Sequence, residues 1–190
     1  MNKRKITGSA KLSVEDKIKA TALDLFSCNG YFSTNISMIA KKAHISNGLI
    51  YHYFKCKTTL LEVILKDRIT SNVKLFGLFN APVQDLNIKE ILKHTFDLLK
   101  VNEAYWKLVF QVLLQKNKFP NAYEIICNEY DKPFLQLLIN YFSYHGYSSP
   151  EVSSRLYFSY VNGIYFDYLF TTRNIDIDRY SDRFIYKTLE

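Results

Sequence analysis

Between Ser46 and Lys57 the sequence concentrates side chains that can bind nucleic acid. Two short polar residues, Ser46 and Asn47, are followed by a glycine and then by Tyr51 and Tyr53. Hydroxyl, amide and ammonium groups donate hydrogen bonds to phosphate oxygens and to the edges of bases. The chemistry that this segment favours is therefore recognition of a polyanion.

The groupings that enzymes use are not found in the sequence. The four histidines lack the His-x-x-x-His and Glu-x-x-His spacings of metal ligands, and no Gly-x-Ser-x-Gly motif occurs. The cysteines Cys28, Cys56 and Cys127 are too far apart for a paired-ligand zinc site and odd in number for a disulfide framework. We therefore expect a protein that is not an enzyme and that uses no cofactor and no metal.

The excess positive charge lies in the first third of the chain. The formal net charge is +7, and the segment from Met1 to Lys57 contains ten basic residues but only three acidic ones, whereas the rest of the chain holds 15 of each. A localised basic region attracts phosphates, because each neutralised phosphate releases counterions. The sequence leaves open whether the first basic residues form an arm that follows DNA or a solubilising tail. These residues are Lys3, Arg4, Lys5 and Lys11.

Apolar residues recur at helical spacing along the whole chain, and the alternation typical of strands is nearly absent. The sequence therefore predicts an all-α fold with about nine helices. Thr34 is the predicted N-cap of the second helix and Ser46 that of the third, in which Ile50 and Phe54 face inward. The break of only a few residues that begins at His44 predicts a helix-turn-helix. Further helices are predicted at about Lys57–Phe79, Ile88–Val101, Glu103–Lys116, Ala122–Tyr144 with a kink or split at Pro133, Glu151–Thr172 and Asp176–Leu189.

The segment from Gly30 to Leu61 resembles the tetracycline-repressor (TetR) family of bacterial regulators. It shares with that family a Gly-aromatic pair, a second helix that ends in Ile-Ala-x-x-Ala, a Tyr-x-Tyr-Phe run in the third helix, and a lysine followed by a leucine pair. The matching residues are Gly30, Tyr31, Thr34, Ile39, Ala40, Ala43, Ser46, Gly48, Ile50, Tyr51, Tyr53, Phe54, Lys57, Leu60 and Leu61. The remainder of the chain agrees with the family only in length, helicity and aromatic content.

The resemblance implies that the third helix enters the major groove of DNA. It assigns phosphate contacts to Tyr51, Tyr53 and Lys57 and a phosphate clamp to Thr34, and Asn47 is the best candidate for reading a base. The predicted DNA-binding residues are Thr34, Ser37, Ser46, Asn47, Gly48, Leu49, Tyr51, His52, Tyr53 and Lys57.

Three positions depart from the family pattern. His44 stands where the turn usually has glycine, so it could strain the turn; it is either a tolerated surface histidine or a sensor of pH or ligand. Leu49 replaces a small polar residue and is either a reader of the thymine methyl group or an added core residue. Cys56 stands where a polar cap is common, and a small structural role is favoured over redox sensing.

Aromatic residues spread over the middle of the chain form the predicted effector site. Each of them also fits ordinary core packing, but as a group they favour an apolar or aromatic effector, or a lipophilic cation. They are Phe76, Phe96, Trp106, Phe110, Tyr123, Tyr130 and Phe134.

The helix predicted at Glu151–Thr172 is apolar almost all round, so it needs cover on both sides. A second subunit can supply part of that cover, and the resemblance implies dimerisation through the last two long helices. The predicted interface consists of Tyr157, Tyr160, Val161, Ile164, Tyr165, Tyr168, Tyr180 and Phe184.

The sequence thus predicts a DNA-binding domain at residues 1–56 and an effector-binding and dimerisation domain at residues 57–190. The predicted protein is a cytoplasmic homodimer that represses transcription from a near-palindromic double-stranded DNA operator and is released by a small-molecule effector. No membrane association is expected. The alternative is a helical ligand-binding or scaffold protein that has lost its ability to read DNA.

Overall fold

The computed structural model describes residues 13–76, 81–171, 176 and 179, and no strand occurs among them. The predicted all-α fold is confirmed. Its α-helices are α1 (Val14–Asn29), α2 (Ile36–Ala43), α3 (Asn47–Tyr53), α4 (Lys57–Phe76), α5 (Ile88–Val101), α6 (Glu103–Leu114), α7 (Pro120–Ile126), α8 (Lys132–Tyr144) and α9 (Pro150–Phe170). Two short 3-10 helices, η2 (Val83–Asp85) and η3 (Lys116–Lys118), and a π-helical turn, η4 (Cys127–Asp131), complete the described elements.

The chain divides into two compact units, Met1–Leu60 and Leu61–Glu190. The division falls inside α4, a few residues after the boundary that the sequence predicts between residues 56 and 57. The functional assignment of the two parts stays a prediction. Within the described ranges, no helix combines the length and the apolar character needed to cross a membrane.

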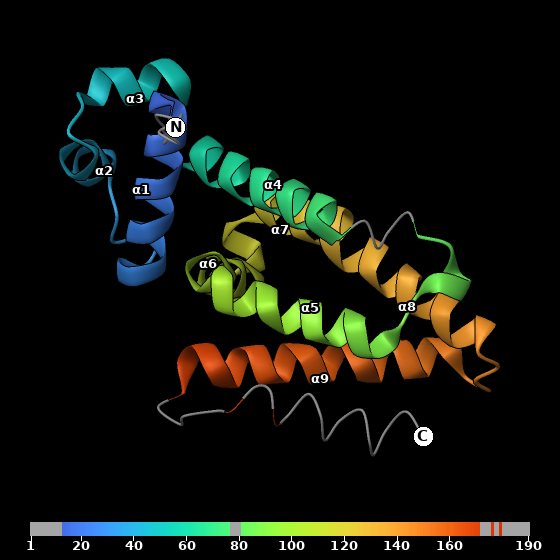
Figure 1. Cartoon of the computed structure of the whole chain (residues 1–190). Coiled ribbons are helices and arrows are strands. Elements are labelled where there is room, and N and C mark those ends of the chain that lie inside the picture. Colours follow the sequence, from blue (N-terminus) through green and yellow to red (C-terminus); the bar gives the residue numbers. More distant parts are fainter. Residues whose placement is uncertain (1–12, 77–80, 172–175, 177–178, 180–190) are drawn as a thin grey trace, which may run out of the picture. The chain divides into compact units, whose positions relative to one another are not determined.

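In the first unit, α1 packs against α2, and α2 continues through a tight turn into α3 (Figure 1). Ser13 caps α1, because its hydroxyl oxygen accepts a hydrogen bond of 3.0 Å from the Asp16 backbone N–H. Each of the helices α1 to α4 contributes one side chain without exposed surface to a common apolar core. These residues are Ile18, Ile39, Ile50 and Leu60. This core holds α2 and α3 in a fixed relation, so that their outer faces form one surface.

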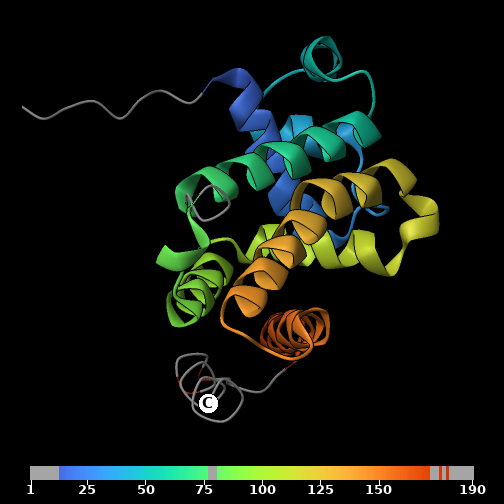
Figure 2. The same cartoon turned by 90° about the vertical axis from the view of Figure 1, so that its right-hand side faces the viewer.

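In the second unit, α8 packs along α9, and Figure 2, which shows α9 nearly end-on, makes the crossing of the two helices visible. Helix α6 also contacts α9. The hydroxyl group of Tyr165 in α9 donates a hydrogen bond to the Thr95 carbonyl oxygen in α5, so a polar contact ties these helices together within the core. The side chains of Tyr165 and Thr95 are both buried.

The predicted kink or split near Pro133 takes the form of a π-helical turn. Helices α7 and α8 are joined without a break by η4, and the Lys132 N–H donates to the carbonyl oxygen of Cys127, five residues earlier. Pro133 has no N–H with which to continue an α-helical ladder, so a wider turn just before it is a physical solution. The helix predicted at Ile88–Val101 has the predicted bounds, whereas the one predicted at Asp176–Leu189 lies almost wholly outside the described residues.

Candidate nucleic-acid interface

The turn between α2 and α3 is closed by backbone hydrogen bonds. His44 ends α2 in the left-handed conformation, with φ 53° and ψ 49°, and the Ile45 N–H donates to the Ala40 carbonyl oxygen over 3.0 Å. Left-handed residues at this position are usually glycine because a Cβ atom is strained there. The expected strain at His44 is therefore present in the backbone. Ser46 then caps α3 as predicted, since its hydroxyl oxygen accepts from the Leu49 N–H at 3.2 Å.

Helix α3 turns one face inward and one outward, as predicted. Ile50 and Phe54 are buried, whereas Tyr51 and Tyr53 expose 53% and 42% of their surfaces. His52 is exposed between the two tyrosines, and its ring meets that of Tyr53 edge-on at 5.3 Å. Both phenol groups therefore lie on the outer surface, where their hydroxyls can reach a phosphate backbone.

Gly48 lies on this outward face with room around it. A Cβ atom added at Gly48 would meet nothing closer than the Ser46 hydroxyl, at 3.9 Å. The fold itself therefore does not require glycine here, but a partner that approaches closely would benefit from the absent side chain. Leu49 is half-buried, which fits both of the roles considered for it.

The side chains of Ser37 and Asn47 connect the outer faces of α2 and α3. The Asn47 amide Nδ2 donates a hydrogen bond of 2.9 Å to the Ser37 hydroxyl oxygen, and both residues are exposed. Two residues that the sequence predicts as separate DNA contacts are thus one hydrogen-bonded pair.

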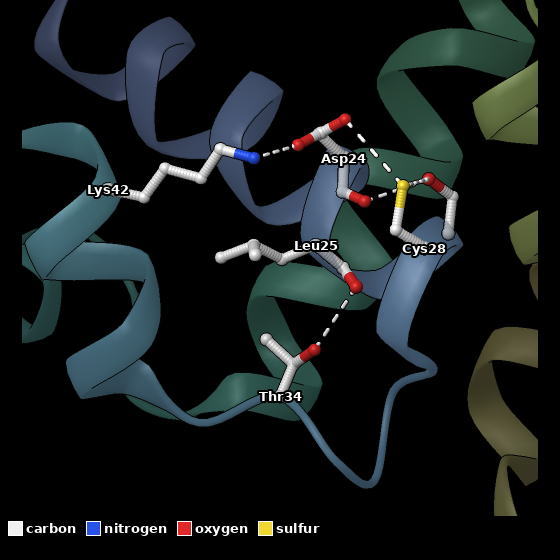
Figure 3. A network of polar contacts seen from close by, with 6 residues as sticks. Asp24, Leu25, Cys28, Thr34 and Lys42 are labelled. Carbon is white, nitrogen blue, oxygen red and sulfur yellow. Dashed lines mark hydrogen bonds and ion pairs between the residues drawn. The ribbon is translucent and has the colours of Figure 1, made fainter.

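Thr34 has a different role from the predicted one. Its side chain is fully buried, and its hydroxyl donates to the carbonyl oxygens of Gly30 at 2.9 Å and Leu25 at 3.2 Å. Figure 3 shows the hydroxyl directed at Leu25 in α1. The N-cap of α2 is the next residue, Asn35, whose side chain accepts from the Met38 N–H at 2.9 Å. The prediction that Thr34 caps α2 is wrong, and its hydroxyl is too deeply placed in this arrangement to clamp a phosphate.

Lys57 is also engaged within the first unit. Its ammonium group donates hydrogen bonds to the carbonyl oxygens of Tyr31 at 2.9 Å and Thr34 at 2.7 Å, and burial lowers the pKa of this group. Tyr31 makes a further contact with the start of α4, because its hydroxyl lies 3.0 Å from that of Thr58. Lys57 therefore fixes the loop before α2, which limits the phosphate-binding role that the resemblance implies.

Some of the positive charge in the first unit is matched by nearby carboxylates. Lys42 in α2 forms an ion pair with Asp24 in α1, and the Cys28 thiol also approaches this carboxylate (Figure 3). Lys41 and Lys55 are exposed. Cys56 lies just before α4 with its sulfur 3.3 Å from the Thr59 hydroxyl, and this contact lowers the pKa of the thiol. Its position before α4 fits the small structural role favoured for it.

The second unit brings together several of the aromatic residues predicted to bind an effector. The Trp106 ring lies 5.4 Å from the Tyr130 ring and 4.9 Å from the Tyr165 ring, measured between centroids. We refer to the following residues as the aromatic cluster: Phe96, Trp106, Tyr130, Phe134 and Tyr165. Phe134 stacks on Tyr130 at 5.7 Å. The sequence analysis placed Tyr165 in the predicted dimer interface and not among the predicted effector residues.

Two polar groups adjoin the aromatic cluster. The indole Nε1 of Trp106 is buried and has no hydrogen-bond partner in the described part of the chain. Asp131 follows Tyr130 in the π turn, and burial raises the pKa of its carboxyl to about 6, although the positive charge of Arg155 opposes this shift. Sequence reasoning missed Asp131, whose surroundings depend on the π turn.

The three remaining residues predicted to bind an effector are not members of the aromatic cluster. Phe110 packs against Phe166 at 5.9 Å and Phe170 at 5.8 Å instead. Tyr123 is half-buried, and its hydrogen bond with Cys127 raises the pKa of its hydroxyl. The side chain of Phe76 is outside the described residues.

Most of the predicted dimer residues of α9 are buried within the protomer. Four of them are buried inside the protomer with 1% to 7% exposure: Tyr157, Val161, Ile164 and Tyr165. Tyr168 donates a hydrogen bond of 2.7 Å to Glu103 in α6, and Tyr160 is half-buried. Tyr180 and Phe184 lie outside the described residues. The assignment of these residues to a dimer interface stays a prediction, and the four buried side chains contact the core of their own protomer.

The opposite face of α9 is exposed and follows a seven-residue repeat. Val152, Leu156, Phe166 and Phe170 are between 44% and 61% exposed. With two small residues between them they form what we call the α9 stripe, spaced alternately by four and three: Val152, Leu156, Ser159, Gly163, Phe166 and Phe170. This spacing is that of a helix seam packed against another helix. The inner face of α9 has the same spacing at Tyr157, Val161, Ile164 and Tyr168, so the repeat alone does not show which face is exposed.

No cluster of three or more His, Cys, Asp or Glu side chains that could hold a metal occurs in the ranges that the structure describes.

Comparison with known proteins places these features in a family context. Residues 18–64, which include α2, the turn and α3, match the family model described as bacterial regulatory proteins, tetR family. Among curated proteins, the chain is similar to the HTH-type transcriptional regulator HbdR of Aromatoleum sp. (strain CIB), with 45% identity over 51 residues, which is 27% of this chain and 22% of HbdR. The first curated relatives are matched over only 22% to 57% of their own length.

Solved structures extend the similarity to nearly the whole chain at the level of the fold. A regulator from Saccharomonospora viridis, solved in complex with choline, has a TM-score of 0.76 and 16% identity, with 91% of this chain and 95% of that chain covered. FadR from Bacillus subtilis, solved in complex with stearoyl-CoA, has a TM-score of 0.71 and 18% identity, with 90% and 95% covered.

Proposed function

The chain belongs to the tetR family of bacterial regulatory proteins, and on this premise we propose that it is a dimeric repressor that binds a near-palindromic DNA operator and is released by a small effector. The observation that carries the proposal is the outer surface of α2 and α3. It presents Asn47, Tyr51 and Tyr53 around Gly48, on a helix fixed to the core by Ile50.

The chemistry of this surface suits double-stranded DNA. Helix α3 enters the major groove, the hydroxyls of Tyr51 and Tyr53 bind phosphates on either side, and the exposed lysines Lys41 and Lys55 add electrostatic attraction. The phosphate contacts set the position of the helix, whereas side chains at its start meet the bases.

The α9 stripe supports a homodimer. An exposed row of apolar side chains with a seven-residue repeat is stabilised when a second copy covers it. The centre of the stripe is small: a Cβ atom added at Gly163 would meet nothing within 4 Å, so side chains of a partner helix can enter there. A two-fold dimer would present two α3 helices to half-sites about 34–36 Å apart, or a multiple of that spacing with some offset.

The aromatic cluster is the proposed effector site. Its rings pack on one another, so an apolar or aromatic ligand has to separate them to bind, and the buried Trp106 N–H offers a hydrogen bond to an oxygen acceptor on the ligand. The adjacent Asp131 carboxylate also makes a lipophilic cation a suitable ligand. The choline and stearoyl-CoA complexes of the two structural neighbours support the idea that regulators of this fold bind small molecules.

Helix α4 is the proposed route by which effector binding acts on DNA binding. It begins at Lys57 in the first unit and continues into the second, so a shift of its second part moves the residue that fixes the loop before α2. An effector that binds only the shifted arrangement lowers the DNA affinity by its preference for that arrangement.

The test is a selection of bound sequences from random duplex DNA with the full chain, followed by a salt titration on the selected duplex. We expect a near-palindrome that is bound more weakly at high salt. A variant with Tyr51→Phe and Tyr53→Phe loses two exposed hydroxyls and should bind all sequences more weakly by a similar factor. Tyr144→Phe is the matched control, because Tyr144 is similarly exposed, at 58%, in the second unit.

Failure to enrich any sequence would overturn the proposal. If the protein then still bound apolar dyes as a dimer, the function would be that of a ligand-binding protein without DNA recognition. Equal loss in the control variant would show that the tyrosine hydroxyls of α3 have no particular role.

A further inference from the structure

The hydrogen bond between Ser37 and Asn47 restricts the orientation of an amide on the outer surface of the first unit. The bond joins the second residue of α2 to the first residue of α3 and has a length of 2.9 Å. An exposed asparagine is otherwise free to rotate about two side-chain bonds. The pairing therefore selects one orientation before any partner arrives.

The bond uses one of the two amide N–H groups of Asn47. A primary amide has two N–H donors and a carbonyl oxygen with two lone pairs. After donation to Ser37, one N–H and the Oδ1 oxygen remain to engage a partner. One donor beside one acceptor is a directional pattern, and not every base edge can match it.

In the major groove, adenine presents an acceptor, N7, beside a donor, the N6 amino group, and asparagine binds this pair with two hydrogen bonds. Guanine presents N7 beside the O6 acceptor, which would oppose the Asn47 Oδ1 oxygen. We propose that Asn47 reads an adenine in each half-site and that Ser37 is the positioning residue that orients the Asn47 amide for this contact.

The neighbouring residues are compatible with this contact. Gly48 adds no side chain next to Asn47, and its Cβ position is open within the protein. The pair lies on α2 and α3, which are fixed to the core by Ile39 and Ile50, respectively. Neither residue has exposed surface, so the core sets the distance between Ser37 and Asn47. The proposal rests on the proposed function, because it requires that this surface binds DNA.

The experiment begins with the duplex selected by the wild-type chain. At each strongly preferred adenine, 7-deazaadenine removes the N7 acceptor and purine removes the N6 amino donor. Both replacements should weaken wild-type binding at one adenine of the half-site. Complete loss of the two-bond contact should cost about 5- to 150-fold in affinity. In Asn47→Ala, the same replacements should have no further effect, since the contact is already absent.

Ser37 is tested through the base preference and not through affinity alone. Ser37→Ala should reduce the preference for adenine over the other bases while leaving the salt dependence of binding unchanged, because no charge is removed. Ser37→Thr keeps a hydroxyl and should retain the preference. Ser27→Ala is the matched control: the Ser27 hydroxyl donates to the Asp24 carbonyl oxygen within α1, away from the pair.

The outcomes separate this inference from the proposed function. If no duplex is selected, the proposed function fails. If a duplex is selected but Asn47→Ala keeps the same base preferences, the inference about Asn47 is overturned and the regulator stands. Selection of guanine at the position that responds to Asn47→Ala would mean that the amide presents two donors, which also overturns it. An unchanged preference in Ser37→Ala would remove the positioning role.

Discussion

The ammonium group of Lys57 lies 4.1 Å from the centre of the Tyr31 ring and donates a 2.9 Å hydrogen bond to the carbonyl oxygen of the same residue. A second bond from this group reaches the Thr34 carbonyl oxygen. The positive charge is thus stabilised by an aromatic face and two carbonyl dipoles at once. The first residue of α4 consequently holds the segment that leads into α2.

We expect Lys57→Ala to lower the free energy of unfolding by about 2 kcal/mol, because two carbonyl oxygens lose their donor in a partly buried loop. Urea denaturation of the full chain measures this. Lys55→Ala is the control, since Lys55 is exposed nearby and should affect DNA binding at low salt but not stability. Equal stability of the two variants would contradict the structural role of Lys57.

His44→Gly should stabilise the protein by about 1 kcal/mol, because glycine adopts the left-handed conformation at φ 53° without the strain that a Cβ atom causes. The same substitution at His52, inside α3, should destabilise it by about 0.5 kcal/mol through loss of helix propensity. Thermal unfolding of both variants checks the opposite signs. Destabilisation by His44→Gly would mean that the histidine ring makes a contact that outweighs the backbone strain.

The features of the first unit that follow from local sequence could be predicted. Ser46 caps α3, and Ile50 and Phe54 face inward, because capping and helical periodicity are properties of neighbouring residues. The cap of α2 could not be decided in this way. Thr34 and Asn35 are both good caps, and the choice depends on the carbonyl oxygens of Leu25 and Gly30, which accept from the Thr34 hydroxyl.

Features that depend on contacts distant in sequence escaped prediction. The partners of Lys57 lie 26 and 23 residues before it, so the family position alone suggested a phosphate contact. In α9, apolar residues occur on every face, and a helical wheel does not reveal which face the rest of the protomer covers. Contact with α6 and α8 buries Tyr157 and Tyr165 and leaves Leu156 and Phe166 outside.

Leu156→Glu should convert the proposed dimer to a monomer, because it places a charge on the α9 stripe where a second copy would pack. Sedimentation or light scattering across a range of protein concentrations measures the change. Leu114→Glu is the control, since Leu114 is 72% exposed on α6 and outside the stripe. A dimer that survives Leu156→Glu would show that the subunits associate through another surface.

Asp131→Asn should stabilise the protein at pH 7.5 and have no effect below about pH 4. The folded state raises the carboxyl pKa from 3.8 to about 6, so ionisation there is costly. Well below pH 3.8 the carboxyl is protonated in both the folded and the unfolded state. The cost of ionising it in the folded state grows as pH rises from 3.8 to about 6 and is complete above that. We expect a gain of about 2 kcal/mol at pH 7.5, after allowance for partial exposure.

Denaturation at several pH values tests this expectation. Asp97→Asn serves as the control, because Asp97 is an exposed carboxylate on α5. A gain from Asp131→Asn that did not vary with pH would show that ionisation of this carboxyl is not the cause.

The π turn also changes the direction in which the side chains after it point around the helix axis, along the segment from α7 to α8. Buried or half-buried apolar and aromatic residues recur there every four positions, whereas an α-helix drifts by about 40° over each four residues. Over the whole series a regular helix would carry the later side chains to the opposite side. The wider turn at Cys127–Asp131 winds less per residue and cancels part of this drift, which leaves the Tyr130 and Phe134 rings within 8° of parallel. The series is Ala122, Ile126, Tyr130, Phe134, Leu138 and Phe142. A single-residue deletion in the π turn would rotate α8 about its own axis relative to α7, and the stacked rings would separate even though every side chain of the series was retained.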